Sequence, residues 1–507
     1  MYLKGEYMEF TISRLLDSGG PTDLAIVDPN GTAIDYACLR NKVEILAHQL
    51  SDWGISSGDR VAIVLPNGLE MITLFLSVSS IATACPLNPA YTKEEFAFYL
   101  DDTGAKALIV PEDGADVARE ACSDDILIIS SSIDSNGNLN LFSHSDLFPK
   151  SEYKLAEPDD VALVLHTSGT TSRPKRVPLT HSNLSASVKN IAESYQLTSK
   201  DITLCVMPLF HVHGIVASLL TTLGTGGTVI IPNSFDAIKF WDLAKSHKVS
   251  WFTAVPSMHN ALVNRAKRRS GAVEKNPNLR FIRSCSSSLA PTLMSDLEDL
   301  FEVPVLEAYG MTEAAHQMAS NPLPPGIRKS GTVGISTGVE IAIMNDEGVM
   351  LDVGEIGEIV IQGSNVVSGY ESNPQANLDS YDSGWFRTGD QGFIDDKGYL
   401  TLTGRIKELI NRSGEKIAPR EIDEVLMSHP CVEEAVAFAV PSNVHGEDVN
   451  AAVLLAEDIS TAELKRFCRT RLAPFKIPRT IHVVSEIPKT ASGKLQRRMV
   501  ADHFNKN

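Results

Sequence analysis

The chain has 507 residues, more than one hydrophobic core normally supports, and its 43% hydrophobic and 21% charged residues are typical of a soluble globular protein. Its formal net charge of -18 disfavours nucleic acid and anionic membranes as partners. The seven cysteines form no CxxC pair, which argues against a zinc site or disulfide framework and fits a reducing compartment.

The first part of the chain alternates helix and strand patterns. In chain order we expect a helix over 38–53, a strand over 60–65, a helix over 69–82, a capped helix opening at 92–95, strands over 106–110 and 161–165, and a helix over 183–195. A second run follows, with strands over 227–231, 251–255, 280–284 and 303–307 and a helix over 235–248. The polar segment 130–149 reads as a surface loop. This alternation predicts parallel sheets with helices on their faces.

From about Gly331 the pattern changes to strands separated by Gly-containing turns, over 339–344, 357–362 and 399–403, which predicts an antiparallel, barrel-like subdomain. After Gly404 a compact unit follows, with helices over 419–428 and 460–472 and strands over 435–440 and 450–455. We therefore predict an α/β fold with a large N-terminal domain, residues 1–403, and a small α+β C-terminal domain, residues 404–507.

A hydroxyl-rich turn follows the strand at 161–165 and reads His166-Thr-Ser-Gly-Thr-Thr-Ser-Arg-Pro-Lys175. Gly lets the backbone approach a ligand, hydroxyls and N–H groups can point at an anion, and Lys adds positive charge. The turn lacks the Gly-Lys-Ser/Thr ending of a Walker A loop. It is therefore a candidate polyphosphate site, with a polar surface turn as the alternative.

Four later segments supply complementary chemistry. They are Tyr309-Gly-Met-Thr-Glu313, Trp385-Phe-Arg-Thr-Gly-Asp390, Gly404-Arg-Ile-Lys407 and Pro488-Lys-Thr-Ala-Ser-Gly-Lys494. Glu313 is a hard ligand suited to Mg²⁺. Asp390, expected on a tight turn, can accept hydrogen bonds from ribose hydroxyls. Each segment alone is weak, because an isolated Thr-Glu, turn Asp or terminal Lys is usually structural or solvated.

Taken together and in order, these segments resemble the adenylate-forming superfamily of acyl-CoA synthetases, luciferases and adenylation domains, from about Phe10 to Phe504. The resemblance implies ATP, Mg²⁺ and coenzyme A as ligands, a mobile C-terminal domain and a hinge at Lys407. It implies Lys494, Thr312 and Glu313 as catalytic residues, with Glu313 also the metal ligand. The implied nucleotide-binding residues are Thr167, Ser168, Gly169, Thr170, Thr171, Lys175, Glu307, Ala308, Tyr309, Thr312, Asp390 and Arg405.

The expected acid pocket is polar. His211, His213, Ser286, Ser287 and His316 could bind a second carboxylate, which needs donors or cations because burying it unpaired is prohibitive. A fatty or aromatic acid would want Gly, Ala and apolar residues instead. Phe-His-Val-His-Gly and Ser-Cys-Ser-Ser-Ser, with the hydroxyl-rich turn, are similar to the oxalate–CoA ligases of plants and yeast. We therefore expect oxalate as the acid. Each His could instead be a core or gate residue: for His213 the two readings are equal, His211 discriminates poorly, and His316 is the sharpest indicator.

Other functions stay open at this point. The acid could be 4-coumarate or a medium-chain acid. A luciferase-like monooxygenase is disfavoured, because nothing in the chain points to an oxidisable luciferin. The chain could also be a nucleotide-binding relative that has lost catalysis, although Lys494, Glu313 and Asp390 argue against this. Arg176 motivates the last, because it stands where the family usually has Gly. We predict that Arg176→Gly raises the catalytic efficiency with ATP, because a Gly needed at positive φ costs roughly 1–2 kcal/mol to replace; Arg176 could instead contact phosphate or point to solvent.

The N-terminus has no secretory pattern, no apolar run reaches membrane length, and the chain ends without a Ser-Lys-Leu signal. We therefore expect a cytoplasmic monomer or weak homodimer that binds a small carboxylic acid, ATP and CoA, with no membrane and no nucleic acid as partner.

Overall fold

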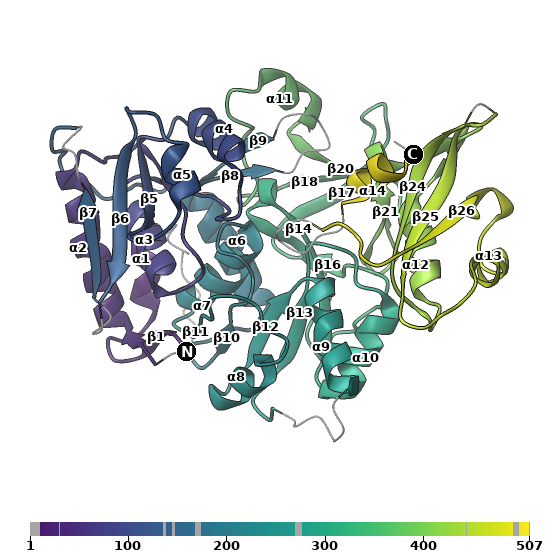
Figure 1. Ribbon diagram of the computed structural model, residues 1–507, viewed down its shortest axis with the longest axis horizontal. Coiled ribbons are helices and arrows are strands. Elements are labelled where there is room, and N and C mark those ends of the chain that lie inside the picture. Colours follow the sequence, from purple (N-terminus) through teal and green to yellow (C-terminus); the bar gives the residue numbers. More distant parts are fainter. Residues whose placement is uncertain are drawn as a thin grey trace.

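The computed structural model describes residues 11–29, 31–134, 138–143, 148–167, 174–268, 276–442, 444–489 and 496–505. They form a large N-terminal domain with two α/β sheets and a curled antiparallel sheet, followed by a small C-terminal domain (Figure 1). The predicted fold class is therefore confirmed. Within these ranges no helix is both long and apolar enough to cross a bilayer.

The first sheet has the strand order β7-β6-β5-β3-β4-β8-β9 and is largely parallel. Its strands are β3 (Arg60–Ile63), β4 (Thr83–Pro86), β5 (Ala107–Pro111), β6 (Leu127–Ile133), β7 (Leu139–Ser143), β8 (Val161–Thr167) and β9 (Lys175–Thr180). Helices α2 (Tyr36–Asp52) and α3 (Leu69–Ser79) cover one face, and α4 (Lys93–Thr103) and α5 (Asp116–Glu120) cover the other. Successive strand residues therefore enter opposite cores: Val61 packs with α2 and α3, and Ala62 packs with α4 and α5.

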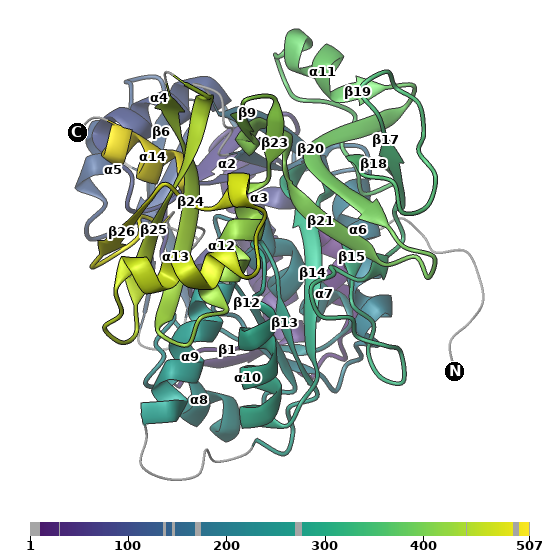
Figure 2. The same cartoon turned by 90° about the vertical axis from the view of Figure 1, so that its right-hand side faces the viewer.

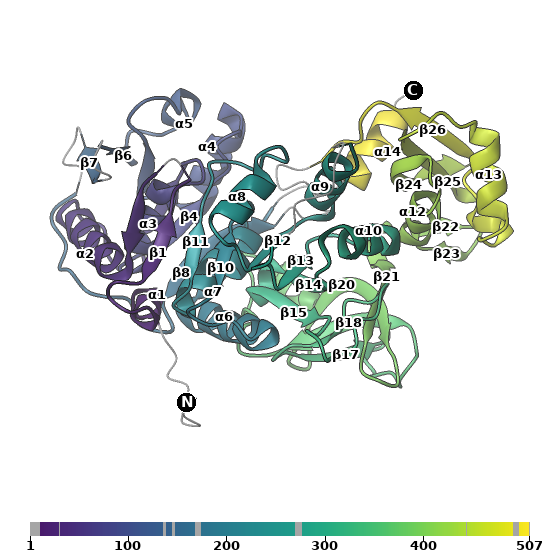
Figure 3. The same cartoon turned by 90° about the horizontal axis from the view of Figure 1, so that it is seen from below.

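The second sheet has the order β16-β15-β14-β13-β12-β10-β11-β1-β2. Its strands are β1 (Leu24–Val27), β2 (Ala33–Asp35), β10 (Ile202–Leu204), β11 (Thr228–Ile230), β12 (Trp251–Ala254), β13 (Phe281–Ser284), β14 (Val305–Met311), β15 (His316–Ser320) and β16 (Ile335–Ser336). Its helices are α1 (Ile12–Leu15), η1 (Leu16–Ser18), α6 (His181–Tyr195), the π-helix η2 (His213–Leu220), α7 (Thr221–Gly224), α8 (Phe240–Ser246), α9 (Pro256–Arg268) and α10 (Pro291–Phe301). Helices α8 and α9 lie on one side of the central strands and α6 on the other (Figure 3).

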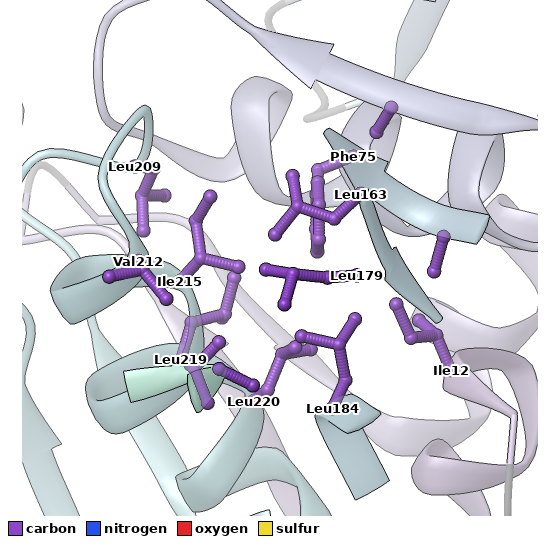
Figure 4. Close-up of a cluster of buried hydrophobic side chains, with 14 of the residues drawn as sticks. Ile12, Phe75, Leu163, Leu179, Leu184, Leu209, Val212, Ile215, Leu219 and Leu220 are labelled. Carbon is purple, nitrogen blue, oxygen red and sulfur yellow. The ribbon is translucent and has the colours of Figure 1, made fainter. Parts of the chain in front are cut away.

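A shared apolar cluster joins the two sheets. Leu163 of β8 and Leu179 of β9 lie among side chains from α3, α6 and η2, as Figure 4 shows. Leu184 and Ile215 are fully buried there, at 1% and 0% exposed. Burying a Leu or Ile side chain contributes roughly 1.5–3 kcal/mol. The cluster therefore fixes β8 and β9, the strands that flank the hydroxyl-rich turn, against helices α3, α6 and η2.

The antiparallel sheet has the order β17-β18-β20-β19, with β21 on the other edge of β20. Its elements are β17 (Glu340–Met344), β18 (Gly357–Gln362), α11 (Pro374–Ser380), β19 (Tyr381–Asp382), β20 (Trp385–Ile394) and β21 (Leu400–Arg405).

The C-terminal domain follows after η4 (Ile406–Glu408), and its sheet has the order β23-β22-β25-β24, with β26 beside β25. Its elements are β22 (Ile410–Arg412), β23 (Glu415–Ile417), α12 (Pro419–Met427), β24 (Val432–Ser442), β25 (Gly446–Leu455), α13 (Thr461–Arg469), η5 (Pro474–Lys476), β26 (Thr480–Val484) and α14 (Arg497–Asn505). Figure 2 shows this sheet beside the large domain, with α12 packed on β24.

Two local predictions are wrong. The segment 130–149 is not simply a surface loop, because its described part contains the end of β6 and all of β7, which form an antiparallel pair. Ser130 and Ser131 are buried there. Asp390 does not lie on a tight turn but within β20, where it pairs with Arg405 of β21. Gly389, with a φ of +73°, produces the turn-like sequence pattern while leaving the strand continuous.

Candidate active site

A cavity of about 610 Å³ lies between the two domains. Its large-domain wall includes the segment after β13, strand β14 and the β20–β21 pair, and its small-domain wall includes α12 and the start of β24. Polar contacts cross the boundary: Ser288 donates to Glu424 at 3.3 Å, and Asn264 donates to Glu433 at 2.8 Å. Part of the cavity wall therefore belongs to the small domain, which these polar contacts hold against the large domain.

The predicted ribose-binding residues form one chain of contacts in this cavity. Asp390 pairs with the Nε of Arg405 at 3.0 Å and accepts a hydrogen bond from the Tyr309 hydroxyl at 2.6 Å. Burial and the nearby Asp390 carboxylate raise the pKa of Tyr309 well above its ordinary value, so Tyr309 is a donor. The carboxylate is fixed from two sides, which leaves it oriented to accept from hydroxyls.

Glu307 and Ala308 line the same cavity on β14. Glu307 is only 2% exposed and accepts from the backbone N–H of Leu289 at 2.9 Å. Burial raises its pKa to about 7, and the nearby Arg420 guanidinium opposes that rise. Because Arg420 belongs to the small domain, the charge of Glu307 depends on how that domain is seated.

Lys175, Tyr370 and Glu313 form a second group of contacts, the predicted phosphate end, which lies outside the residues that line the cavity. The Lys175 ammonium lies 4.2 Å from the centroid of the Tyr370 ring, and the Tyr370 hydroxyl donates to Glu313 at 2.7 Å. Burial lowers the pKa of Lys175, and the Glu313 carboxylate opposes this. Burial raises the pKa of Glu313, and the hydrogen bond from Tyr370 opposes this. The pKa values of Lys175 and Glu313 therefore depend on one another.

The donor set fits a magnesium ion held jointly with phosphates. Glu313 is 6% exposed and has a hard carboxylate, of which Oε1 accepts from Tyr370. No cluster of three or more potential ligands occurs among the described His, Cys, Asp and Glu residues. Mg²⁺ in nucleotide sites is usually bound through one or two carboxylates together with substrate phosphates, so a single carboxylate is consistent with it.

Several predicted residues lie beside this end or outside the described ranges. Ser168, Gly169, Thr170, Thr171 and Lys494 are outside the described residues. Thr167 ends β8, Thr312 opens η3 (Thr312–Ala314), and Lys407 lies exposed on η4. The Lys407 charge is close enough to lower the pKa of Lys175. The hinge role of Lys407 and the residue 403/404 boundary stay predictions.

Arg176 does not behave as expected from sequence. It lies in β9 opposite His166, without a positive φ, so the position does not require Gly. Its guanidinium donates to the backbone carbonyl of Asp102 and lies 3.6 Å from the Asp102 carboxylate and 3.9 Å from Glu371. His166 contacts the same Asp102 carboxylate at 3.0 Å. Arg176 therefore neither points to solvent nor occupies the phosphate end, and Asp102 joins both strands that flank the hydroxyl-rich turn.

The predicted acid-binding residues separate into two layers. Ser286 and Ser287 line the cavity, whereas His213 and His316 are buried behind its wall. His213 Nδ1 lies 3.0 Å from the Ser286 hydroxyl, and the two imidazole rings meet edge to face at 4.9 Å. His211 is half-buried and accepts from the backbone N–H of His213 at 3.2 Å.

His316 is unusual in two ways. Its backbone has a φ of +101°, and neither ring nitrogen has a hydrogen-bond partner in the described part of the chain, although the side chain is buried. A Cβ on Gly310 would lie 1.9 Å from the His316 carbonyl oxygen, so the cavity wall requires Gly at this contact. Buried polar groups without partners are rare and cluster at functional sites. The direct role of each His in acid binding stays a prediction.

Sequence reasoning missed Tyr370 and Arg283. Tyr370 lies on the segment before α11 and contacts both Lys175 and Glu313. Arg283, in β13, is fully buried, and it donates to the neutral groups of Tyr195, Thr253 and Gln317. One sequence feature could have revealed it: a single Arg inside the apolar strand pattern Phe281-Ile-Arg-Ser.

Comparison with known proteins identifies the family. The family model described as "AMP-binding enzyme" matches residues 18–371, and the model described as "AMP-binding enzyme C-terminal domain" matches residues 421–494. The chain therefore belongs to the AMP-binding, adenylate-forming enzymes.

Three similar proteins are informative. The Oxalate--CoA ligase of Arabidopsis thaliana is 48% identical over 482 residues, covering 93% of each chain. The Oxalate--CoA ligase of Saccharomyces cerevisiae is 44% identical over 479 residues, covering 89% of this chain and 87% of that protein. The crystal structure of ATP-bound MatB from Rhodopseudomonas palustris superposes with a TM-score of 0.87 at 27% identity, covering 98% of this chain and 99% of that one.

Proposed function

We propose that this chain is an ATP-dependent acid–thiol ligase that converts oxalate, ATP and CoA into oxalyl-CoA, AMP and pyrophosphate. The observation that supports this best is the agreement between relatives and pocket. The two relatives named Oxalate--CoA ligase match nearly the full chain, and the cavity wall where we place the acid carries the polar Ser286, which His213 contacts from behind.

The chemistry has two displacements. A carboxylate oxygen of the acid attacks the α-phosphorus of ATP, the bond to the β-phosphate bridging oxygen breaks, and pyrophosphate leaves. The CoA thiolate then attacks the acyl carbon, the acyl–phosphate bond breaks, and AMP leaves. Both reactants of the first step are anions, so fixed positive charge at the phosphate end lowers their repulsion.

The nucleotide residues have matching roles in this proposal. Asp390, held by Tyr309 and Arg405, would accept from the ribose hydroxyls. Lys175 would bind phosphate oxygens, and Glu313 would hold Mg²⁺ with them. When bound, Mg²⁺ supplies positive charge that stabilises the developing negative charge. The hydroxyl-rich turn 167–171 and Lys494, which we assign to the phosphates and to the first displacement, complete the set.

The acid is tested by AMP release in the presence of CoA, with oxalate, malonate, 4-coumarate and octanoate compared at equal concentration. We expect oxalate to give the highest kcat/KM. A preference for 4-coumarate or octanoate would contradict the polar pocket, because an apolar chain buried against Ser286 and His213 leaves their hydrogen-bonding groups without partners. If none of these acids supports AMP release, the chain is better explained as a relative that only binds nucleotide.

The role of Lys494 is tested by separating the half-reactions. Lys494→Ala should abolish pyrophosphate exchange but spare thioester formation from chemically prepared acyl-adenylate. Lys489→Ala is a matched control, because Lys489 lies near the same end of the chain and pairs with Glu434. Equal loss of both half-reactions in Lys494→Ala would contradict the assigned role.

A further inference from the structure

A chain of buried hydrogen bonds runs from Arg283 to the wall of the acid pocket. The Arg283 guanidinium donates to the Thr253 hydroxyl at 2.9 Å, and that hydroxyl lies 2.6 Å from His213 Nε2. His213 Nδ1 in turn lies 3.0 Å from the Ser286 hydroxyl. Arg283, Thr253 and His213 are all fully buried, whereas Ser286 lines the cavity.

The donors around His213 Nε2 favour one direction for this chain of hydrogen bonds. Arginine has only donors. A second Arg283 contact, from Nη1 to His213 Nε2 at 3.4 Å, places a guanidinium N–H beside that ring nitrogen. An N–H on Nε2 would face that donor, which favours an Nε2 that presents its lone pair. Thr253, which already accepts from Arg283, then has its single proton to donate to Nε2.

The tautomer of His213 follows. With Nε2 unprotonated, the ring proton of a neutral imidazole is on Nδ1, and Nδ1–H donates to the Ser286 oxygen. Burial lowers the pKa of His213 well below its ordinary value, and the neighbouring His316 and Arg283 lower it further, which agrees with a neutral ring. Ser286 accepts from His213, so its own hydroxyl proton is available for a group inside the cavity.

The rest of the surroundings hold Arg283 in place. Its Nε donates to the Tyr195 hydroxyl at 2.8 Å, and Nη2 donates to Gln317 at 3.0 Å. These neutral acceptors come from α6 and β15, so elements on two sides of β13 aim the guanidinium at Thr253. Ser286 has a φ of +73°, a backbone conformation that a non-glycine residue adopts only under strain. Such strain is typical of functional positions.

We propose that Arg283 and Thr253 are positioning residues that set the tautomer of His213 and thereby make Ser286 a hydrogen-bond donor to the carboxylate of the bound acid. This inference deepens the proposed function and rests on it for the identity of the acid. Arg283 does not touch the acid in this arrangement, because it is fully buried behind the wall and acts through Thr253 and His213.

The tautomer can be measured without any acid. In protein labelled with ¹⁵N-histidine, long-range ¹H–¹⁵N correlation distinguishes protonated from unprotonated ring nitrogens, and His213→Gln identifies the relevant signals by their disappearance. We expect His213 to have a protonated Nδ1 and an unprotonated Nε2. A proton on Nε2, or a doubly protonated ring, would overturn the inference and leave the proposed function standing.

Kinetics test the consequence. Thr253→Val removes the hydroxyl at nearly constant volume, and Thr253→Ser keeps it. With the acid that wild type prefers, Thr253→Val should raise the KM for acid about ten-fold, as expected for weakening a hydrogen bond to a charged group. The KM for ATP should be unchanged, and Thr253→Ser should behave as wild type. Equal increases in both KM values would indicate a general structural effect and contradict the inference.

A double-mutant cycle shows whether Thr253 acts through Ser286. Ser286→Ala alone should also raise the KM for acid, and Thr253→Val should then have little further effect in the Ser286→Ala background. Additive effects would mean that the two residues act independently, which would refute the relay. A wild-type preference for another acid would overturn the oxalate assignment, whereas the tautomer and the cycle would still decide the relay.

Discussion

Replacing Arg176 by Gly should weaken this protein, because Arg176 holds one strand beside the hydroxyl-rich turn. Its guanidinium donates to the Asp102 carbonyl, and its side chain is only 14% exposed. Losing a hydrogen bond from a charged donor costs about 1.5–3 kcal/mol. The ion pairs at 3.6 and 3.9 Å are partly exposed, and such pairs contribute about 0.2–1 kcal/mol in total.

The backbone adds a smaller cost. Gly inside a strand is less stable than Ala by about 0.5–1 kcal/mol, so Arg176→Gly should cost about 2–5 kcal/mol altogether. In the variant, Asp102 retains its contact with His166 and Glu371 retains its ion pair with Arg60. The loss of stability is therefore limited to the contacts of Arg176 itself. For a cooperative unit the size of the large domain, this corresponds to a fall in Tm of roughly 2–6 °C. A looser strand beside the turn should also raise the KM for ATP several-fold.

The assay is calorimetry of purified protein together with the ATP dependence of AMP release. Arg176→Ala is the matched control, since it removes the same contacts without the glycine backbone and should retain about 0.5–1 kcal/mol more stability. An Arg176→Gly protein with an unchanged or higher Tm and a higher kcat/KM for ATP would refute this reasoning. It would also restore the view that the position prefers Gly.

The remaining predictions concern the nucleotide end. Asp390→Asn should raise the KM for ATP about ten-fold or more, because it weakens an acceptor and leaves Arg405 without its carboxylate; an unchanged KM would argue against ribose binding. Tyr370→Phe removes the donor that lowers the pKa of Glu313, so the acidic limb of the kcat/KM profile should move to higher pH, which a pH series with saturating Mg²⁺ measures. Burial raises the pKa of Glu307 from 4.5 to about 7, so the folded protein binds an extra proton between these values and loses stability as pH rises through that window. Glu307→Gln should therefore raise Tm at pH 8 and hardly change it at about pH 4.5; the same Tm difference at both pH values would contradict the raised pKa.

The sequence predicted the architecture well where local pattern and burial agree. The apolar strand at 161–165 and the capping box at Thr92 appear in the structure as expected, because short apolar runs and caps act locally. The hairpin of β6 and β7 was missed because Ser130 and Ser131 lie buried within a strand that looks polar. Pairing with β5, which is distant in sequence, stabilises it. Tertiary context can override β-propensity in this way.

The candidate site was predictable only in part. Motif order indicated Asp390, Arg405 and Glu313, but the pairing of Asp390 with Arg405 across two strands is visible only in the fold. Arg176 was misinterpreted because its acidic partners come from α4 and from the segment before α11. Nothing in a local window shows which carboxylate a distant helix will place beside a strand.

Arg283 has a further consequence for how an acidic protein binds three anionic ligands. Arg405 is paired with Asp390, and the Glu313 carboxylate partly offsets the burial of Lys175, so each of these cations has a carboxylate nearby before ligands arrive. Arg283 is different, because the described acceptors around it are neutral and burial denies it solvent. A buried charge without a counter-charge is costly, and that cost falls when an anion enters nearby. We therefore expect the buried charge of Arg283 to favour entry of an anion near it, whatever the net charge of -18 on the whole chain.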